Sequence, residues 1–384
     1  MHFQYFTPTI LLVGSGRVSE TGELAGAYGR RAFVVSSASA LRSGALARVL
    51  EELTKCRIAF HDWLKPPGEP TVSMADESAE IARTQACDLV ISVGGGSVID
   101  LAKAAAGLAT NGGNAKEYLE GVGFGRTFNR PALPHIALPT TAGTGTEVTR
   151  NAVLCSPEEK FKKSLRSPYL CPQAAILDAE LTVGLPSRQT AASGMDAITQ
   201  LIESYLSNRS NPITDALSLF GLDLALGAIR EAFLHGNRLP ARENLLLAGT
   251  ISGICLANSG LGMAHGFASG LGAMYNIPHC LACAILLPHA LHYNRTAACA
   301  KLAVLGQRFH PSAGGSDNAR TDLAIAFIEQ LNRDLQIPPD LRSFSISRDD
   351  LPLLAEKSMG NSMTGNPVEV SIPQAIDFLE SLVS

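Results

Sequence analysis

Four polar side chains in the second half of the chain have the chemistry of a divalent metal site. Asp196 and Gln200 are four residues apart in a segment with helical periodicity, so both lie on one helix face. His265 and His279 fall within residues 244–294, a stretch that contains no Asp, Glu, Lys or Arg. A carboxylate, an amide oxygen and two imidazoles can hold a divalent ion and leave one coordination position open. The spacing alone is also typical of hydrogen-bonded core histidines, so this pattern needs support from elsewhere in the chain.

Other metal-type residues in this stretch favour a structural interpretation. The eight cysteines are scattered, and the one close pair is Cys280 and Cys283. No second CxxC completes a zinc site, and on a helix the pair is typical of small buried apolar residues. His289 and His292 follow on the same expected buried helix, and we interpret them as structural.

A glycine-rich segment in the first half has the pattern of a phosphate cradle. Residues 94–97 (Gly-Gly-Gly-Ser) follow a strand-like run at 88–93 and open an expected helix over 99–108. Glycines allow the backbone to approach a ligand closely, and the free amides of a helix N-terminus favour an anion such as pyrophosphate. The segment matches neither G-x-G-x-x-G nor the Walker loop, and a strand-to-helix turn without a ligand remains the alternative.

A second segment, residues 138–151, is rich in hydroxyl groups. Five threonines fall within residues 140–149, together with Gly143 and Gly145. Hydroxyls and free amides at the end of a strand favour a ligand-binding loop over a plain surface loop.

The pattern of expected strands and helices predicts that the first half of the chain is an α/β domain. Strand-like runs at 31–36, 88–93 and 135–138 alternate with helical patterns, which predicts a parallel sheet covered on both faces. Such sheets bind ligands at the carboxyl ends of their strands. Beyond Pro186 only helical periodicity remains. We therefore expect an α/β nucleotide-binding domain over 1–186, an all-helical metal and substrate domain over 187–384, and a ligand site in the cleft between them.

Composition excludes several classes of protein. With 384 residues, 46% hydrophobic and 17% charged, the chain is neither disordered nor a coiled coil. The net charge of −4 argues against nucleic acid as a partner. The N-terminus lacks a signal-peptide pattern, and the longest apolar run in 244–294, Leu281 to Leu287, is far below the ~20 residues of a membrane span. We expect a cytoplasmic enzyme with reduced thiols and no membrane partner.

These motifs, in this order, resemble the iron-containing (group III) alcohol dehydrogenase family over essentially the whole chain. The resemblance rests on 94–97 with Asp100 and Lys103, on Pro139 to Thr149, on Gly194 to Ala197, and on the segment from His265 to His289. It implies interconversion of a small alcohol with its aldehyde or ketone, with NAD or NADP and a divalent metal, Fe²⁺ or Zn²⁺. It also implies a homo-oligomer.

The resemblance assigns roles to individual residues. It implies that the pyrophosphate region is contacted by Gly95, Gly96, Ser97 and Asp100. It places Thr140, Thr141, Thr144, Thr149, Asn151 and Lys162 along the adenosine and pyrophosphate site. It implies the metal ligands Asp196, His265 and His279, with Gln200 at a fourth ligand position.

The chain departs from the family pattern at three positions. Gln200 stands where the family usually has His, and an amide oxygen is a weaker ligand than imidazole. Ser269 stands where members often have a second His near the nicotinamide, so we expect a hydroxyl relay for the proton. Ser37 stands where NAD-specific members tend to have an acidic residue, so NADPH is an expected coenzyme as well.

The expected mechanism is hydride transfer between nicotinamide and a substrate whose oxygen is polarised by the metal. Two alternatives stay open. The altered ligand set also fits a metal-independent reductase resembling maleylacetate reductase, or a catalytically silent nucleotide-binding homologue. Dehydroquinate synthase chemistry is disfavoured, because residues 244–294 lack the basic side chains that would grip its substrate.

Overall fold

The strands expected at 31–36, 88–93 and 135–138 pair side by side in one parallel sheet. A computed structural model describes residues 2–383. Its main sheet has the order β1-β8-β5-β4-β2-β3, and all neighbours are parallel. The strands are β1 (Ile10–Val13), β2 (Arg31–Ser37), β3 (Ala59–Lys65), β4 (Leu89–Gly94), β5 (His135–Pro139) and β8 (Ala174–Leu177). An antiparallel hairpin, β6 (Asn151–Ser156) and β7 (Phe161–Arg166), stands beside it.

Helices cover both faces of this sheet, as the buried β-branched strands predict. Along β2, Phe33 and Val35 face one core and Ala32 and Val34 the other, because side chains alternate along a strand. The helices of this half are α1 (Thr21–Tyr28), α2 (Ala38–Arg42), α3 (Ala45–Lys55), α4 (Val72–Thr84), α5 (Gly96–Asn111) and α6 (Ala115–Tyr118). Helices α4 and α5 pack on the first face and α3 on the second.

The order of the strands locates a crevice for ligands. The chain runs outward from β2 to β3, returns to place β4 on the other side of β2, and continues to β5 and β8. The direction therefore reverses between β2 and β4. In open α/β sheets the ligand crevice lies at such a reversal, at the carboxyl ends of the strands.

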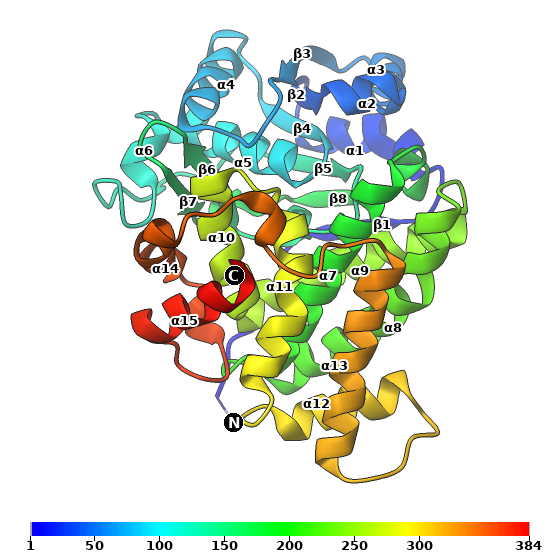
Figure 1. Cartoon of the computed structure of the whole chain (residues 1–384). Helices are drawn as coiled ribbons and strands as arrows, with labels where there is room; N and C mark the ends of the chain where they lie inside the picture. Colours follow the sequence, from blue (N-terminus) through cyan, green and yellow to red (C-terminus); the bar gives the residue numbers. More distant parts are fainter. Residues whose placement is uncertain (1, 384) are drawn as a thin grey trace.

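The second half is helical, as expected, and lies below the sheet in Figure 1. The described residues after Leu177 contain no strand. The helices are α7 (Ser187–Leu206), α8 (Pro212–Leu234), α9 (Leu239–Ser259), α10 (Met263–Tyr275), α11 (His279–Asn294), α12 (Cys299–Phe309), α13 (Asp317–Asp334), α14 (Leu351–Ser358) and α15 (Ile372–Val383). Their core reaches up to Ala137 and Leu177 of the sheet. The division at residues 186 and 187 stays a prediction.

One long apolar helix meets the length and composition of a membrane span. Within residues 2–383 this is α8, and the bent pair α9 and α10 meets the same test together. Core helices of soluble proteins meet it as well. The uncharged stretch 244–294 is mostly buried, in agreement with its interpretation as protein interior.

Candidate active site

The glycine-rich segment lies at the carboxyl end of the sheet, beside the threonine-rich segment. Strand β4 ends at Gly94, and the Thr140 amide after β5 donates to the Gly94 carbonyl at 3.0 Å. A Cβ added at Gly96 would lie 2.6 Å from Thr144 Oγ1, so the close approach of the two segments requires glycine there. Helix α5 begins at Gly96, and its first amides face the crevice with the positive end of the helix dipole.

A buried polar network fixes the threonine-rich segment behind this loop. Lys103 is fully buried and donates to Thr146 Oγ1, Thr149 Oγ1 and the Asn151 carbonyl, each at 2.9 Å. Asp100 accepts a hydrogen bond from the Thr146 hydroxyl. Burial lowers the pKa of Lys103 and raises that of Asp100. Asp100, expected at the pyrophosphate, also holds the neighbouring loop in place.

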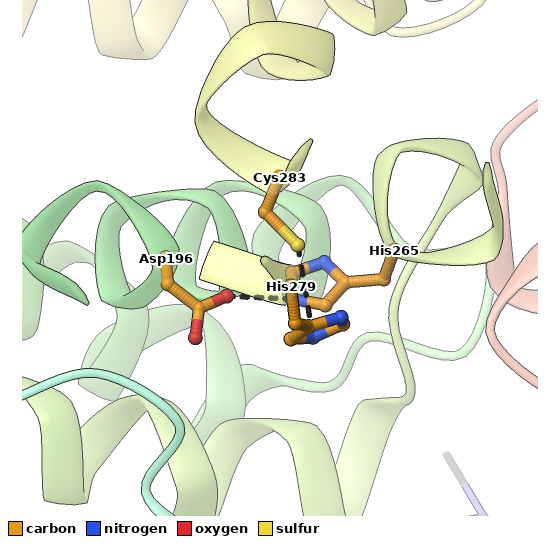
Figure 2. Close-up of side chains that lie close together, drawn as sticks. All are labelled: Asp196, His265, His279 and Cys283. Carbon is orange, nitrogen blue, oxygen red and sulfur yellow. Dashed lines mark hydrogen bonds and ion pairs between the residues drawn. The ribbon is translucent and has the colours of Figure 1, made fainter. Parts of the chain in front are cut away.

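Three helices bring four metal-type side chains to one point. Figure 2 shows Asp196 of α7, His265 of α10, and His279 and Cys283 of α11 pointing toward one another. One donor atom from each lies within 4.8 Å of all the others.

The donor atoms fit a bound cation. Asp196 is fully buried, and its Oδ1 lies 3.3 Å from His265 Nε2. Among the described residues, Asp196 Oδ1, His265 Nε2 and His279 Nδ1 are buried without a hydrogen-bond partner. Buried polar atoms are rarely left unpaired unless something absent from the polypeptide satisfies them. A divalent ion beside Asp196 Oδ1 and His265 Nε2 would satisfy both of these atoms together.

Glu203, which the sequence analysis missed, orients one of these ligands. Its Oε2 lies 2.6 Å from His265 Nδ1, and its Oε1 accepts from the Ala264 amide at 2.7 Å. A Cβ on Gly262 would lie 2.7 Å from Glu203 Oε1, so glycine makes room for the carboxylate. Because Nδ1–H is donated to Glu203, the lone pair of Nε2 is directed at the site, as in carboxylate–histidine–metal arrangements. The available signal was spacing: Glu203 follows Asp196 by seven residues and thus shares its helix face.

The electrostatics of the group follow from its burial. Burial would raise the pKa of Asp196, but the neighbouring imidazoles of His265 and His279 together lower it. Burial would lower the pKa of His265, but the Cys283 sulfur and the two carboxylates raise it well above its ordinary value. Burial lowers the pKa of His279 to about 4. Asp196 and Glu203 face opposite nitrogens of the His265 ring, and their two charges favour positive charge at this buried point.

The cysteine pair lies at this site, which corrects its interpretation as small core residues. Cys280 Sγ donates to Asp196 Oδ2 at 3.3 Å, and Cys283 Sγ lies 3.7 Å from His279 Nε2. Residues four apart on a helix share a face, so His279 and Cys283 meet the same point. Cys283 is buried as expected and Cys280 is half-buried, and both face polar side chains rather than hydrocarbon.

Gln200 lies on the same face of α7 with both ends of its amide engaged. Its Nε2 donates to the Thr144 carbonyl at 3.3 Å, and its Oε1 accepts from the Ser252 hydroxyl of α9 at 3.0 Å. It therefore connects the threonine-rich segment to two helices of the second half.

One cavity of about 1810 Å³ collects the residues that the sequence predicted. Single drug-sized ligands occupy about 300 to 1,000 Å³, so this volume accommodates a dinucleotide with a substrate. It is lined by Ser37, Gly95, Gly96, Ser97, Asp100, Thr140, Thr141, Thr144, Thr149, Asn151, Lys162, Gln200, His265, Ser269 and His279. Asp196 lies behind this lining, with no exposed surface.

The remaining predicted residues have clear positions. Ser37 ends β2, where its hydroxyl accepts from the Ala40 amide at 3.2 Å and caps α2. Ser269 lies one turn after His265 on α10. Outside the cavity, His289 binds the Pro339 carbonyl at 2.8 Å, and His292 pairs with Glu329 at 2.9 Å on the surface.

A cradle for a dinucleotide beside a buried carboxylate–imidazole metal group defines an oxidoreductase of the dehydrogenase class. Residues 8–179 match the family described as "Iron-containing alcohol dehydrogenase", and residues 190–383 match "Fe-containing alcohol dehydrogenase family, C-terminal". The chain is 34% identical to 1,3-propanediol dehydrogenase of Klebsiella pneumoniae over 96% of this chain and 97% of that protein.

Solved structures give the same result. The crystal structure of a 1,3-propanediol oxidoreductase superimposes with a TM-score of 0.94 at 31% identity, covering 100% of both chains. Sulfoacetaldehyde reductase of Bifidobacterium kashiwanohense, solved with NAD⁺, gives 0.89 at 28% identity over 100% of this chain and 99% of that one. The chain belongs to the iron-containing alcohol dehydrogenase family. It is an oxidoreductase of alcohols and aldehydes whose cofactors are an NAD-type dinucleotide and a divalent metal.

Proposed function

We propose that this enzyme interconverts a small alcohol with its aldehyde or ketone at the junction of α5, the threonine-rich segment and the buried metal group. The observation that carries the proposal is the single cavity that holds the predicted coenzyme residues and the predicted metal residues together. The lining from Leu256 to Leu261 is mostly apolar or small, which favours a neutral substrate.

In this proposal, the chain's own residues bind and orient the cofactors. The amides of Gly95, Gly96 and Ser97 bind the pyrophosphate, and Asp100 holds the loop beside it. The threonine hydroxyls with Asn151 and Lys162 line the rest of the dinucleotide, and Ser37 receives the adenosine ribose. Since Ser37 carries no charge, it accepts NADP as well as NAD.

Asp196, His265 and His279 would hold the divalent ion. When bound, the ion supplies Lewis acidity for the substrate oxygen, and the dinucleotide supplies or accepts the hydride. Glu203 fixes the tautomer of His265. The Ser269 hydroxyl passes the substrate proton toward water, since the imidazole usual at this position is missing.

The test combines metal analysis with a substrate panel. The enzyme is purified without air and without chelator, and its metal content is measured by mass spectrometry. Aldehydes and alcohols are then assayed with NADH, NADPH and their oxidised forms. We expect one metal ion per chain and turnover of small neutral aldehydes, both lost in His265→Ala and both kept in His292→Ala, which removes a surface histidine. Turnover by a protein that takes up no metal would favour the metal-independent reductase, and coenzyme binding without turnover the silent homologue.

We further propose a cytoplasmic homo-oligomer. All eight cysteines are free, as expected for a reducing compartment. Light scattering after size-exclusion chromatography tests the assembly, and a monomer at micromolar concentration would contradict it.

A further inference from the structure

The donor set around the metal position contains a sulfur atom that the family resemblance does not assign. Cys283 has no exposed surface, and its Sγ approaches both imidazoles of the site. Its donor atom belongs to the group of four within 4.8 Å. Gln200, which occupies the position usual for a histidine, instead has its amide oxygen accepting from Ser252.

The amide orientation of Gln200 follows from its partners. Rotating the amide by half a turn would place its oxygen against the Thr144 carbonyl oxygen, two acceptors facing one another. The nitrogen must therefore face Thr144, which keeps the oxygen on the Ser252 side. Gln200 is a connection between segments rather than a free donor.

The distances around Cys283 match a tetrahedral site. With bonds of about 2.0 Å to nitrogen or oxygen and about 2.3 Å to sulfur, tetrahedral donors lie about 3.3 Å apart for a nitrogen–oxygen pair and about 3.5 Å apart for a nitrogen–sulfur pair. The structure has 3.3 Å between Asp196 Oδ1 and His265 Nε2, and 3.7 Å between His279 Nε2 and Cys283 Sγ. These two pairs of donor atoms are close to tetrahedral spacing, and all four donor atoms lie within 4.8 Å of one another.

We propose that Cys283, and not Gln200, supplies the fourth protein ligand, so that the site is Asp196, His265, His279 and a thiolate, and the substrate oxygen would enter as a fifth ligand. This proposal rests on the metal-dependent function proposed above and specifies its metal. On binding, the Sγ–H bond breaks, the proton passes to the buffer, and a sulfur–metal bond forms without oxidation or reduction. Thiolate and carboxylate together balance the charge of a divalent ion.

The chemistry of the sulfur determines which metal the site prefers. Thiolate is a softer ligand than imidazole or amide oxygen, and Cys/His sets select zinc over the harder first-row ions. We therefore infer a zinc enzyme within a family named for iron. Cys280 is a positioning residue, because its thiol donates to Asp196 Oδ2 and leaves Oδ1 directed at the ion.

X-ray absorption of the zinc-loaded wild-type enzyme tests the proposal without any substitution. We expect one sulfur at about 2.3 Å together with nitrogen and oxygen donors at about 2.0 Å. A shell of nitrogen and oxygen alone would overturn the thiolate and leave the metal-dependent function standing. A protein that takes up no zinc or cobalt would overturn both.

Cobalt substitution identifies which residue contributes the sulfur. A thiolate bound to Co²⁺ gives a sulfur-to-metal charge-transfer band in the near ultraviolet. We expect this band in the wild type, its loss in Cys283→Ser, and its retention in Cys280→Ser and Gln200→Ala. A band that survives in Cys283→Ser, or disappears in either of the other two variants, would overturn the assignment. Circular dichroism confirms folding of each variant, and the X-ray result decides if Cys283→Ser does not fold.

Discussion

Replacing Glu203 by glutamine removes one charge from behind the metal site without changing the size of the side chain. The carboxylate accepts on both oxygens: Oε1 from the Ala264 amide at 2.7 Å, and Oε2 from His265 Nδ1 at 2.6 Å. A glutamine has one acceptor and one donor, so either orientation turns an NH₂ group toward another N–H. The glutamine side chain has two possible orientations: one lowers folding stability, and the other weakens metal binding.

In the first way, the NH₂ group faces Ala264 and leaves a buried amide unpaired, which costs about 1 to 3 kcal/mol of stability. In the second, the NH₂ group donates to His265 Nδ1, which moves the ring proton to Nε2 and removes the lone pair that faces the ion. Substitutions of this kind lower metal affinity about 10- to 100-fold, or about 1.4 to 2.7 kcal/mol.

The assay is a competition between the protein and a chelator for Zn²⁺ or Co²⁺, carried out on the wild type and Glu203→Gln. Glu231→Gln is the matched control, because Glu231 pairs with Arg238 on the surface of α8. We expect the control to bind metal as the wild type does. A dissociation constant for Glu203→Gln within twofold of the wild type, together with unchanged folding stability, would refute the argument that Glu203 holds both His265 and the Ala264 amide.

Three further outcomes follow from other parts of the structure. In Gly96→Ala, the new Cβ would lie 2.6 Å from Thr144 Oγ1, so we expect the affinity for NADH, measured by fluorescence titration, to fall about tenfold or more, or about 1.4 kcal/mol. Gly227→Ala is the control, because its added Cβ meets nothing within 4 Å, and its affinity for NADH should not change. In Ser37→Asp, the new carboxylate would repel the 2′-phosphate of NADPH and bind the ribose diol of NADH. The ratio of kcat/KM for NADPH to kcat/KM for NADH should therefore fall about tenfold. An unchanged ratio would place the adenosine ribose elsewhere. Burial, together with the charge of Lys103, lowers the pKa of His135 from 6.5 to about 3. As the pH falls below 6.5, the unfolded state therefore takes up a proton that the folded state does not. The free energy of unfolding should drop by about 2 kcal/mol at pH 5. Urea unfolding at pH 7 and pH 5 should show this loss in the wild type and not in His135→Gln, and equal losses in both would contradict it.

Much of the fold could be predicted because the buried strands are largely apolar runs followed by serine, glycine or Pro-Thr. The runs at 31–36, 88–93 and 135–138 became β2, β4 and β5 in this way. Other strands carried no such signal. β3 is an edge strand whose exposed positions include Phe60 and Leu64, and β1 and β8 have four residues each, too few for a period to show.

The sequence predicted which residue types form the site and how they are spaced, but it did not predict which side chains contact one another. Asp196, Gln200 and Glu203 share one face of α7, and the periodicity of the helix says nothing about which of them reaches the ion. That choice depends on where α10 and α11 cross α7. The packing of these helices turns Glu203 toward the start of α10 and brings His279 and Cys283 of α11 to Asp196, while Gln200 accepts from Ser252 of α9.

The threonine-rich segment explains how the two halves of the site keep a fixed relation. Gly145 has φ +59°, and a Cβ added to it would lie 2.4 Å from the Gly249 carbonyl oxygen. A Cβ added to Gly253 would lie 2.1 Å from the Gly145 carbonyl oxygen. The backbone of the segment thus rests directly on α9, and Glu147 accepts from the Thr250 hydroxyl at 2.6 Å in the same place. The same segment faces the glycine loop through Thr144. The Thr144 carbonyl also accepts from Gln200 of α7, the helix that carries Asp196. Packing of glycines, and not a flexible linker, therefore fixes the glycine loop relative to the metal-type residues.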